Sequence, residues 1–171
     1  MLTVALCGVK AAGRVTRIDD ENRDLVSQYR WHVREATYPG LRSNGPYAQT
    51  NIRLPGPPRR YKSLSMHTLI TGWPRVDHID HDGLNNQRAN LRPATPGQNN
   101  ANCRPNAVSS SPFKGVYWYK AGRIWRAKIT ISGKKYHLGQ FTSEEDAARA
   151  YDAMAWEAWG EYACLNFPTP G

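Results

Sequence analysis

The two stretches that decide the fold of this chain are VDHIDHDG (residues 76–83) and NLRPATPGQN (residues 90–99). A short strand is predicted over residues 76–80, and the alternation of a strand puts Asp77 and His78 on opposite faces. Residues 82–86, Asp-Gly-Leu-Asn-Asn, are typical of a turn in which Asp-Gly takes positive φ. An Asp-His pair is therefore expected on a strand that leads into a polar turn.

The second stretch carries the start of a helix. Thr95 is expected as the N-cap, Pro96 suits the first helical position, and Gln98 follows the cap by three residues as in a capping box. Asn99 then lies on the first turn of that helix. The order strand, turn, strand and helix puts Asp-His at one end of the motif and an amide at the other.

This arrangement resembles the HNH nuclease family with its ββα-metal site. The family's first pair falls on Asp77-His78, its central Asn on Asn90, and its last position on Asn99. An Asn at the last position is a pattern of the phage and intron homing branch of that family. The resemblance covers Ser65 to Asn102, and it implies that Asn90 braces the loop carrying His78.

The resemblance implies metal-dependent cleavage of a phosphodiester. His78 is the expected general base, because histidine titrates near neutral pH. Asp77 and the side-chain carbonyl of Asn99 are the expected metal ligands, with water and phosphate completing the shell. The expected cofactor is a divalent metal, Mg²⁺ first and Mn²⁺ as the alternative.

Other interpretations of the same residues stay open. Asp80 and Asp82 lie in an oxygen-rich loop, but the ligand spacing and terminal Glu of a calcium EF-hand are absent. A structural zinc could use His67, His78, His81 and Cys103. The stretch could also be a polar surface turn without a function. For His67, a contact to phosphate and a semi-buried structural role are equally well supported.

Residues 1–64 are predicted to form a β-rich scaffold. Strands are expected over the segments 1–8, 14–18, 31–33 and 47–54, with a short helix over 22–28 and turns at 38–40 and 55–58. A helical segment of one or two turns is expected over 65–72. With the HNH-like residues 65–104, this scaffold is predicted to make one domain, 1–104, followed by a linker over 105–112.

The last part of the chain predicts a three-stranded sheet and a helix. Strands are expected over 113–120, 123–131 and 134–141, followed by a helix capped by Thr142 or Ser143 and stopped by Gly160. The apolar face is expected to hold Val116, Trp118, Trp125, Ala127, Ile129, Ile131, Tyr136 and Leu138. From Phe113 to Phe141 there are seven Lys or Arg and no acid. The opposite face is therefore expected to be basic and aromatic.

This segment, Phe113 to Pro168, resembles the DNA-binding domain of the plant Apetala and ethylene-response-factor class. The resemblance lies in residues 114–116, 125–129, 138–141, 147–152 and 165–168. It implies that the sheet lies in the major groove of DNA. The residues expected to contact DNA are Tyr117, Tyr119, Arg126, Lys128, Thr130, Lys135 and His137. Tyrosines stand where that family has arginines, so its sequence preference does not carry over, and a solvated basic face is the alternative.

Composition agrees with a nucleic-acid partner. The 23 Lys and Arg exceed 14 acidic residues, giving a net charge of +9, and a basic surface gains free energy by releasing counterions from phosphate. Three widely spaced cysteines indicate neither a disulfide framework nor a CxxC zinc site. We expect no membrane segment, and the cytoplasm of a bacterial or phage-infected cell as the location.

The sequence thus predicts an α+β protein: a β-rich scaffold with a ββα-metal core, joined to a DNA-binding domain at 113–168. The expected function is a metal-dependent endonuclease of the phage or homing type acting on double-stranded DNA. The alternatives are a catalytically silent DNA-binding regulator and a phage packaging component. The oligomeric state, monomer or dimer, stays open.

Overall fold

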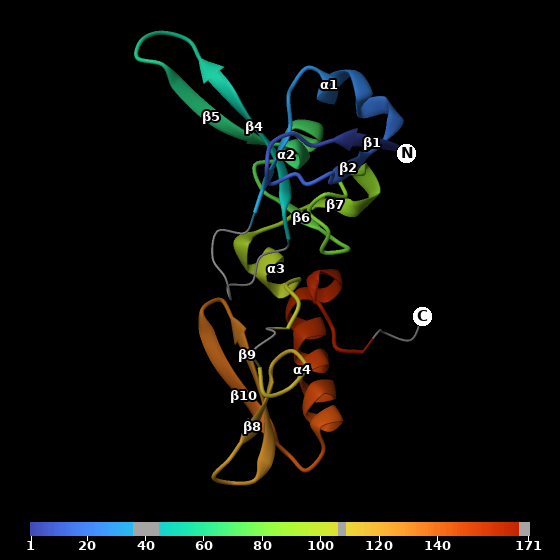
Figure 1. Cartoon of the computed structure of the whole chain (residues 1–171). Coiled ribbons are helices and arrows are strands. Elements are labelled where there is room, and N and C mark those ends of the chain that lie inside the picture. Colours follow the sequence, from blue (N-terminus) through green and yellow to red (C-terminus); the bar gives the residue numbers. More distant parts are fainter. Residues whose placement is uncertain (36–44, 106–108, 168–171) are drawn as a thin grey trace. The chain divides into compact units, whose positions relative to one another are not determined.

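A computed structural model describes residues 1–35, 45–105 and 109–167 of the chain. They form a mixed α+β protein of small antiparallel sheets and short helices (Figure 1), so the predicted fold class is confirmed at this level. The described residues divide into two compact units, one before Thr95 and one from Thr95 onward. The predicted domains and linker stay a prediction, and the turn predicted at 38–40 lies outside the described residues.

The scaffold of the N-terminal unit is built around two antiparallel sheets. Strands β1 (Leu2–Ala5) and β2 (Val15–Ile18) pair with each other, and β3 (His32–Arg34), β4 (Tyr47–Leu54) and β5 (Arg60–Ser65) form a sheet in the order β3-β4-β5. Helices η1 (Asp20–Asn22), α1 (Arg23–Ser27) and α2 (Met66–Thr71) complete the scaffold. The core consists of Leu6, Ala11, Ile18, Val26, Trp31, Val33, Ala48 and Met66.

Strand β5 is absent from the sequence prediction. It runs over Arg60–Ser65, where Arg60, Tyr61, Lys62 and Ser63 are all exposed. A strand that buries neither face lacks the alternation of apolar and polar residues from which strands are recognised. Backbone pairing with β4, from Gln49–Ser65 to Leu54–Arg60, holds it in place.

The strand, turn, strand and helix of the central motif are present. Strand β6 (Val76–His78) pairs with β7 (Leu91–Pro93) after the short helix η2 (Arg88–Asn90), and α3 (Pro96–Ala101) follows. The Thr95 side chain accepts from the Gln98 backbone N–H and the Gln98 side chain accepts from the Thr95 N–H, so the predicted capping box is confirmed. Strand β6 ends at His78, two residues earlier than predicted, because the chain turns through His81 at φ 67°.

The C-terminal unit matches the predicted order of elements. Strands β8 (Val116–Tyr119), β9 (Ile124–Ile131) and β10 (Lys134–Phe141) form an antiparallel sheet with β9 in the centre. Helix α4 (Glu144–Trp159) lies along one face of this sheet and leads into η3 (Gly160–Tyr162). Ser143 caps α4 by accepting from the Asp146 backbone N–H at 3.3 Å, and three acidic residues occupy the first turn, where the helix dipole favours them.

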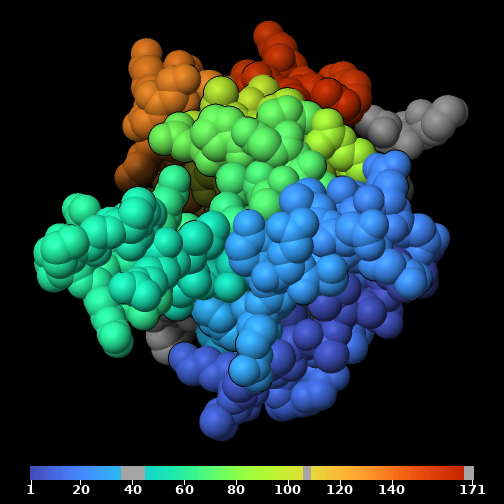
Figure 2. Space-filling model, turned by 90° about the horizontal axis from the view of Figure 1, so that it is seen from above, coloured from blue at the N-terminus to red at the C-terminus, as the bar shows by residue number. Residues whose placement is uncertain are grey.

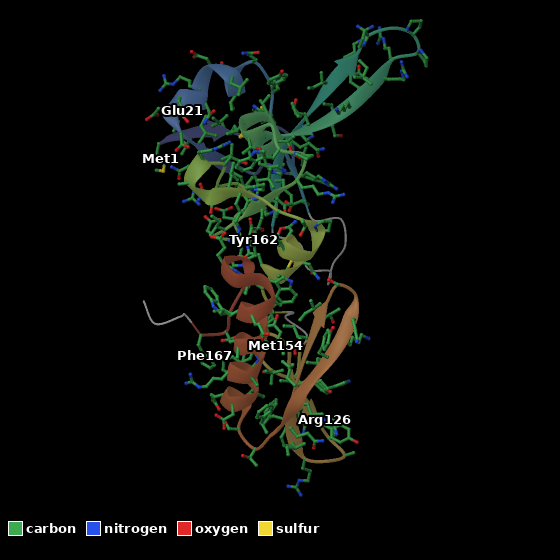
Figure 3. All side chains as sticks on the ribbon, turned by 180° about the vertical axis from the view of Figure 1, so that it is seen from behind. Met1, Glu21, Arg126, Met154, Tyr162 and Phe167 are labelled. Carbon is green, nitrogen blue, oxygen red and sulfur yellow. The ribbon has the colours of Figure 1, made fainter. Side chains whose placement is uncertain are left out.

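The sheet and α4 share two apolar clusters. One contains the buried residues Val116, Ala127, Ala147 and Ala148, and the other contains Ile129, Tyr151 and Ala155. Met154, labelled in Figure 3, packs against the second cluster. In the strand register Trp118 is opposite Trp125 and Tyr136 is opposite Ile129, so both lie on the predicted face, although they are 36% and 38% exposed. Trp118 meets the edge of Trp125, with ring centroids 4.9 Å apart.

Helix α3 belongs to the C-terminal unit. The carbonyl of Ala101, in the last turn of α3, accepts a hydrogen bond from the Lys114 ammonium and another from the Cys164 backbone N–H at 3.1 Å. Lys114 is only 4% exposed, so a buried cation holds the carbonyl end of the helix. The helix is thereby fixed to segments that flank the sheet-and-helix fold.

Candidate functional site

His78 lies at the end of β6 in a buried, aromatic environment. Its side chain is 1% exposed, and its ring centroid lies 5.1 Å from that of His67 and 5.6 Å from that of Tyr47. Its Nε2 lies 3.4 Å from the side-chain oxygen of Asn86. The histidine predicted from the sequence is therefore enclosed by His67, Tyr47 and Asn86.

Asn86 connects His78 to the N-terminal scaffold. Its amide Nδ2 donates to the Thr16 hydroxyl at 2.8 Å, and that hydroxyl donates to the Leu84 carbonyl at 2.7 Å. Asn86 and Thr16 are both completely buried. Because Nδ2 faces Thr16, the Asn86 oxygen faces His78 and acts as an acceptor for Nε2–H.

Burial lowers the pKa of both neighbouring histidines. For His78 the main cause is desolvation, opposed by the hydrogen bond to Asn86 and then by the charges of Asp80 and Asp77. For His67, desolvation together with the nearby His78 lowers the pKa to about 3. His67 is therefore neutral near pH 7, and a contact to phosphate would rest on an N–H donor and not on a positive charge.

Asp77 is held by an arginine from the facing strand. It is completely buried, and its Oδ2 accepts from Arg92 Nε at 2.9 Å and from Nη2 at 2.8 Å. Asp77 and Arg92 stand directly opposite each other in the β6–β7 register. This forked ion pair fixes the orientation of the carboxylate.

Asn90 ties together the loop that follows His78. Its side-chain oxygen accepts from the Asp80 backbone N–H at 3.0 Å, and its amide donates to the Asn85 carbonyl and to Asp80 Oδ1, both at 2.9 Å. Its own carbonyl accepts from the Ile79 N–H at 3.0 Å. These bonds fix the loop at both ends, which is the arrangement that the resemblance leads us to expect of Asn90.

Strand β2 supports the same loop from the other side. The Arg17 backbone N–H donates to the Leu84 carbonyl and the Arg17 carbonyl accepts from the Asn86 N–H, both at 2.8 Å. The Arg17 guanidinium also pairs with Asp82 at 2.7 Å. The N-terminal region is thus a structural part of the candidate site.

Gly83 is required by close packing. A Cβ atom at this position would lie 2.6 Å from the Pro46 carbonyl oxygen and 2.7 Å from the Tyr47 ring. The prediction that Asp-Gly takes positive φ is wrong, since the positive φ of this loop belongs to His81. The glycine lets the loop approach Tyr47, which in turn packs against His78.

Asp77, His78 and Asn90 are brought together in the N-terminal unit. Asn99 lies on α3, which belongs to the C-terminal unit, so its position relative to the other three stays a prediction. Within the described part of the chain, no group of three or more His, Cys, Asp or Glu side chains could hold a metal. The zinc alternative therefore finds no site there. A carboxylate and an amide oxygen, with water and phosphate, remain a donor set that suits Mg²⁺.

The face of the C-terminal sheet opposite α4 is basic and aromatic, as predicted. The Arg126 guanidinium lies 3.5 Å from the Tyr119 ring centroid, and the Lys128 ammonium lies 4.6 Å from that of Tyr117. Arg126 is labelled on this sheet in Figure 3. Its Nε has no hydrogen-bond partner among the described residues. Thr130 and Lys135 are opposite each other in the register, as are Lys128 and His137.

Sequence reasoning missed Asn86, Thr16, Arg92 and Tyr47. Arg92 had a usable signal, because a hairpin with Asp77 and Arg92 equally far from its turn places them opposite each other. For Asn86 the sequence showed only that it is one of two asparagines in a predicted turn, and nothing in it indicated a contact with His78. Thr16 and Tyr47 come from other parts of the chain, so nothing in the local sequence connects them with His78.

Comparisons with known proteins agree with both resemblances. A protein of Acanthamoeba polyphaga mimivirus, named an uncharacterized HNH endonuclease, is 34% identical over 142 residues, which is 83% of this chain and 69% of that protein. Protein 3.8 of Escherichia phage T7 is 37% identical over 63 residues, which is 37% of this chain and about half, 52%, of the phage protein.

The third comparison is with a plant protein. An APETALA2-like protein 2 of Oryza sativa subsp. japonica is 48% identical over 63 residues, which is 36% of this chain and 14% of the plant protein. No family model and no solved structure matches. The chain thus contains an AP2-like DNA-binding region. Because its similarity to the mimivirus protein extends over most of both chains, it belongs to the HNH endonuclease family.

Proposed function

We propose that this chain is a metal-dependent endonuclease that hydrolyses phosphodiester bonds of double-stranded DNA. The observation that carries the proposal is the Asp77-His78 pair at the end of β6. Both side chains are buried and held by neighbours of their own unit, Arg92 for the aspartate and Asn86 for the histidine. Membership of the HNH family supports the reaction class.

His78 is proposed as the general base. Its lowered pKa keeps the imidazole neutral near pH 7, which is the form that accepts a proton. The contact with the Asn86 oxygen favours the tautomer with the proton on Nε2, which makes Nδ1 the basic nitrogen. His78 would take a proton from a water molecule as that water attacks the phosphorus, and the 3′ oxygen would leave.

Asp77 and Asn99 are proposed as the protein ligands of a divalent cation, with Mg²⁺ first and Mn²⁺ second. A hard cation stabilises the negative charge that develops on phosphate oxygens during hydrolysis. On this chain, Arg92 would keep the Asp77 carboxylate oriented, and the capping box would set the start of the helix that carries Asn99. Asn90 would hold the loop that follows His78 in place.

The AP2-like sheet is proposed as the surface that positions DNA. Tyr117, Tyr119, Arg126, Lys128, Thr130, Lys135 and His137 are the proposed contact residues. Lysines there would neutralise phosphates, and the guanidinium of Arg126 would donate to phosphate or to a base edge. One proposed active site per chain favours a nick as the product of a monomer.

The test is a cleavage assay on supercoiled plasmid with Mg²⁺ or Mn²⁺, with and without EDTA. We expect nicked plasmid only when the free metal is present. Tight binding without nicking on any DNA would favour a silent regulator. Cleavage that appears only after another subunit is added would favour a packaging component.

A further inference from the structure

The β4–β5 hairpin ends in an exposed basic ribbon. Figures 1 and 2 show the hairpin projecting away from the remainder of its unit. Its outer part, residues 51–63, is called the basic arm. It has no acidic residue, and its four exposed cations are Arg53, Arg59, Arg60 and Lys62.

Both faces of the basic arm carry positive charge. In the β4–β5 register Arg53 is opposite Tyr61, whereas Lys62 and Arg60 are opposite Ile52 and Leu54. Opposite residues of an antiparallel pair share a face. The first face therefore presents an arginine beside a tyrosine that is 61% exposed, and the second face presents an arginine and a lysine.

Nothing in the described part of the chain compensates these charges. None of the four cations takes part in an ion pair with a described residue. In sequence, the nearest acidic residues are Glu35 before the arm and Asp77 after it. Like charges on one ribbon repel each other, so the charge opposes hairpin formation unless an anionic partner binds.

We propose that the basic arm is a second DNA-contacting element that binds phosphates of the duplex. A two-stranded ribbon fits the width of the major groove, and arginine, lysine and tyrosine are common donors to phosphate. Cations on both faces suit a groove with a phosphate backbone on each side. This inference rests on the proposed function in that DNA is the substrate, and it adds an element that the AP2-like sheet does not supply.

The test compares two triple variants of the full chain with equal net charge. The arm variant is Arg53→Gln, Arg60→Gln and Lys62→Gln, and the control is Lys10→Gln, Arg23→Gln and Arg30→Gln, three exposed cations of the same unit. Binding to a duplex is measured over a series of salt concentrations. For the arm variant the slope of log K against log[salt] should fall by about 2 to 3, and affinity at about 0.15 M salt by about tenfold or more.

The control variant should stay close to the wild type in slope and affinity. Equal slopes for the two triple variants would overturn the proposal for the arm. If the wild-type chain binds and cleaves DNA while the arm variant is unchanged, only the arm proposal fails. If the wild-type chain binds no duplex at all, both proposals fail. Unchanged DNA binding with lost binding to phosphatidylserine vesicles would assign the arm a different partner and also overturn it.

Discussion

The Asp77-His78 site and the AP2-like sheet hold polar groups in opposite ways. At the first, the side chains with proposed catalytic roles are buried, and each is oriented by a neighbour of the same unit, Arg92 for Asp77 and Asn86 for His78. On the sheet, Arg126 and Lys128 rest on tyrosine rings. Groups placed for chemistry need one fixed geometry, whereas groups that meet a large anion can keep adjustable contacts.

The largest expected effect separates chemistry from binding. His78→Ala removes the proposed base, so cleavage at saturating DNA should fall by about 100-fold or more. Affinity for DNA should change less than about twofold, because His78 is buried and the basic surfaces remain. A plasmid-nicking assay and a binding titration measure the two quantities. His32→Ala, a histidine outside the site, is the control, and an equal loss of binding in the His78 variant would contradict the assigned role.

Gly115→Ala tests whether the sheet needs as close a fit beneath its surface as the His78 site does. Gly115 has φ +80°, and a Cβ there would lie 2.0 Å from the Tyr151 ring and 2.8 Å from the Lys128 carbonyl oxygen. The free energy of unfolding of the C-terminal unit should fall by about 2–4 kcal/mol. Hydrogen exchange of the α4 amides measures this loss.

Gly133→Ala is the matched control for Gly115→Ala. Gly133 has a similar φ of +79° but no atom within 4 Å of a Cβ. Only backbone strain of about 1–2 kcal/mol is expected there. Equal destabilisation by the two substitutions would mean that packing under the sheet is loose.

Arg126→Ala combined with Lys128→Ala tests whether the basic face of the AP2-like sheet contributes affinity for DNA and not the chemical step. Affinity for duplex should fall, and the salt slope should decrease by about 1 to 2, as expected for one or two lost phosphate contacts. Cleavage by fully bound enzyme should persist. Arg23→Ala with Arg30→Ala makes the same charge change in the other unit. A loss of cleavage at saturation would show that the two cations also serve the chemical step.

His67→Gln concerns how the stability of the chain depends on pH. The pKa of His67 is about 3 in the folded chain, below its ordinary 6.5. Between these values the unfolded chain binds a proton that the folded chain does not, so stability falls as pH drops below 6.5. The slope is about 1.4 kcal/mol per pH unit. Urea unfolding at pH 7 and pH 5 should show a smaller loss for the Gln variant. Parallel losses in both proteins would contradict the burial of His67.

The sequence predicted what depends on neighbouring residues. The capping box at Thr95 and the three strands of the AP2-like region follow from local patterns, whereas the strand before the turn ends at His78, two residues earlier than predicted. Contacts across the chain could not be predicted, because Thr16 and Asn86 are 70 residues apart and meet only in the folded core. The role of Gly83 depends on its close approach to Tyr47, which is also far from it in sequence, so no local pattern predicts it. Strand β5 was not predicted, because a strand that buries neither face lacks the alternation of apolar and polar residues.

Helix α3 sets where the chain could be divided into fragments. Its last carbonyl accepts from Lys114 and Cys164, which stand near the two ends of the AP2-like region in sequence. A fragment that ends before Phe113 would keep α3 and lose both of these donors. A fragment of the C-terminal unit is therefore expected to be more stable when it begins near Thr95, before α3, than when it begins at Phe113.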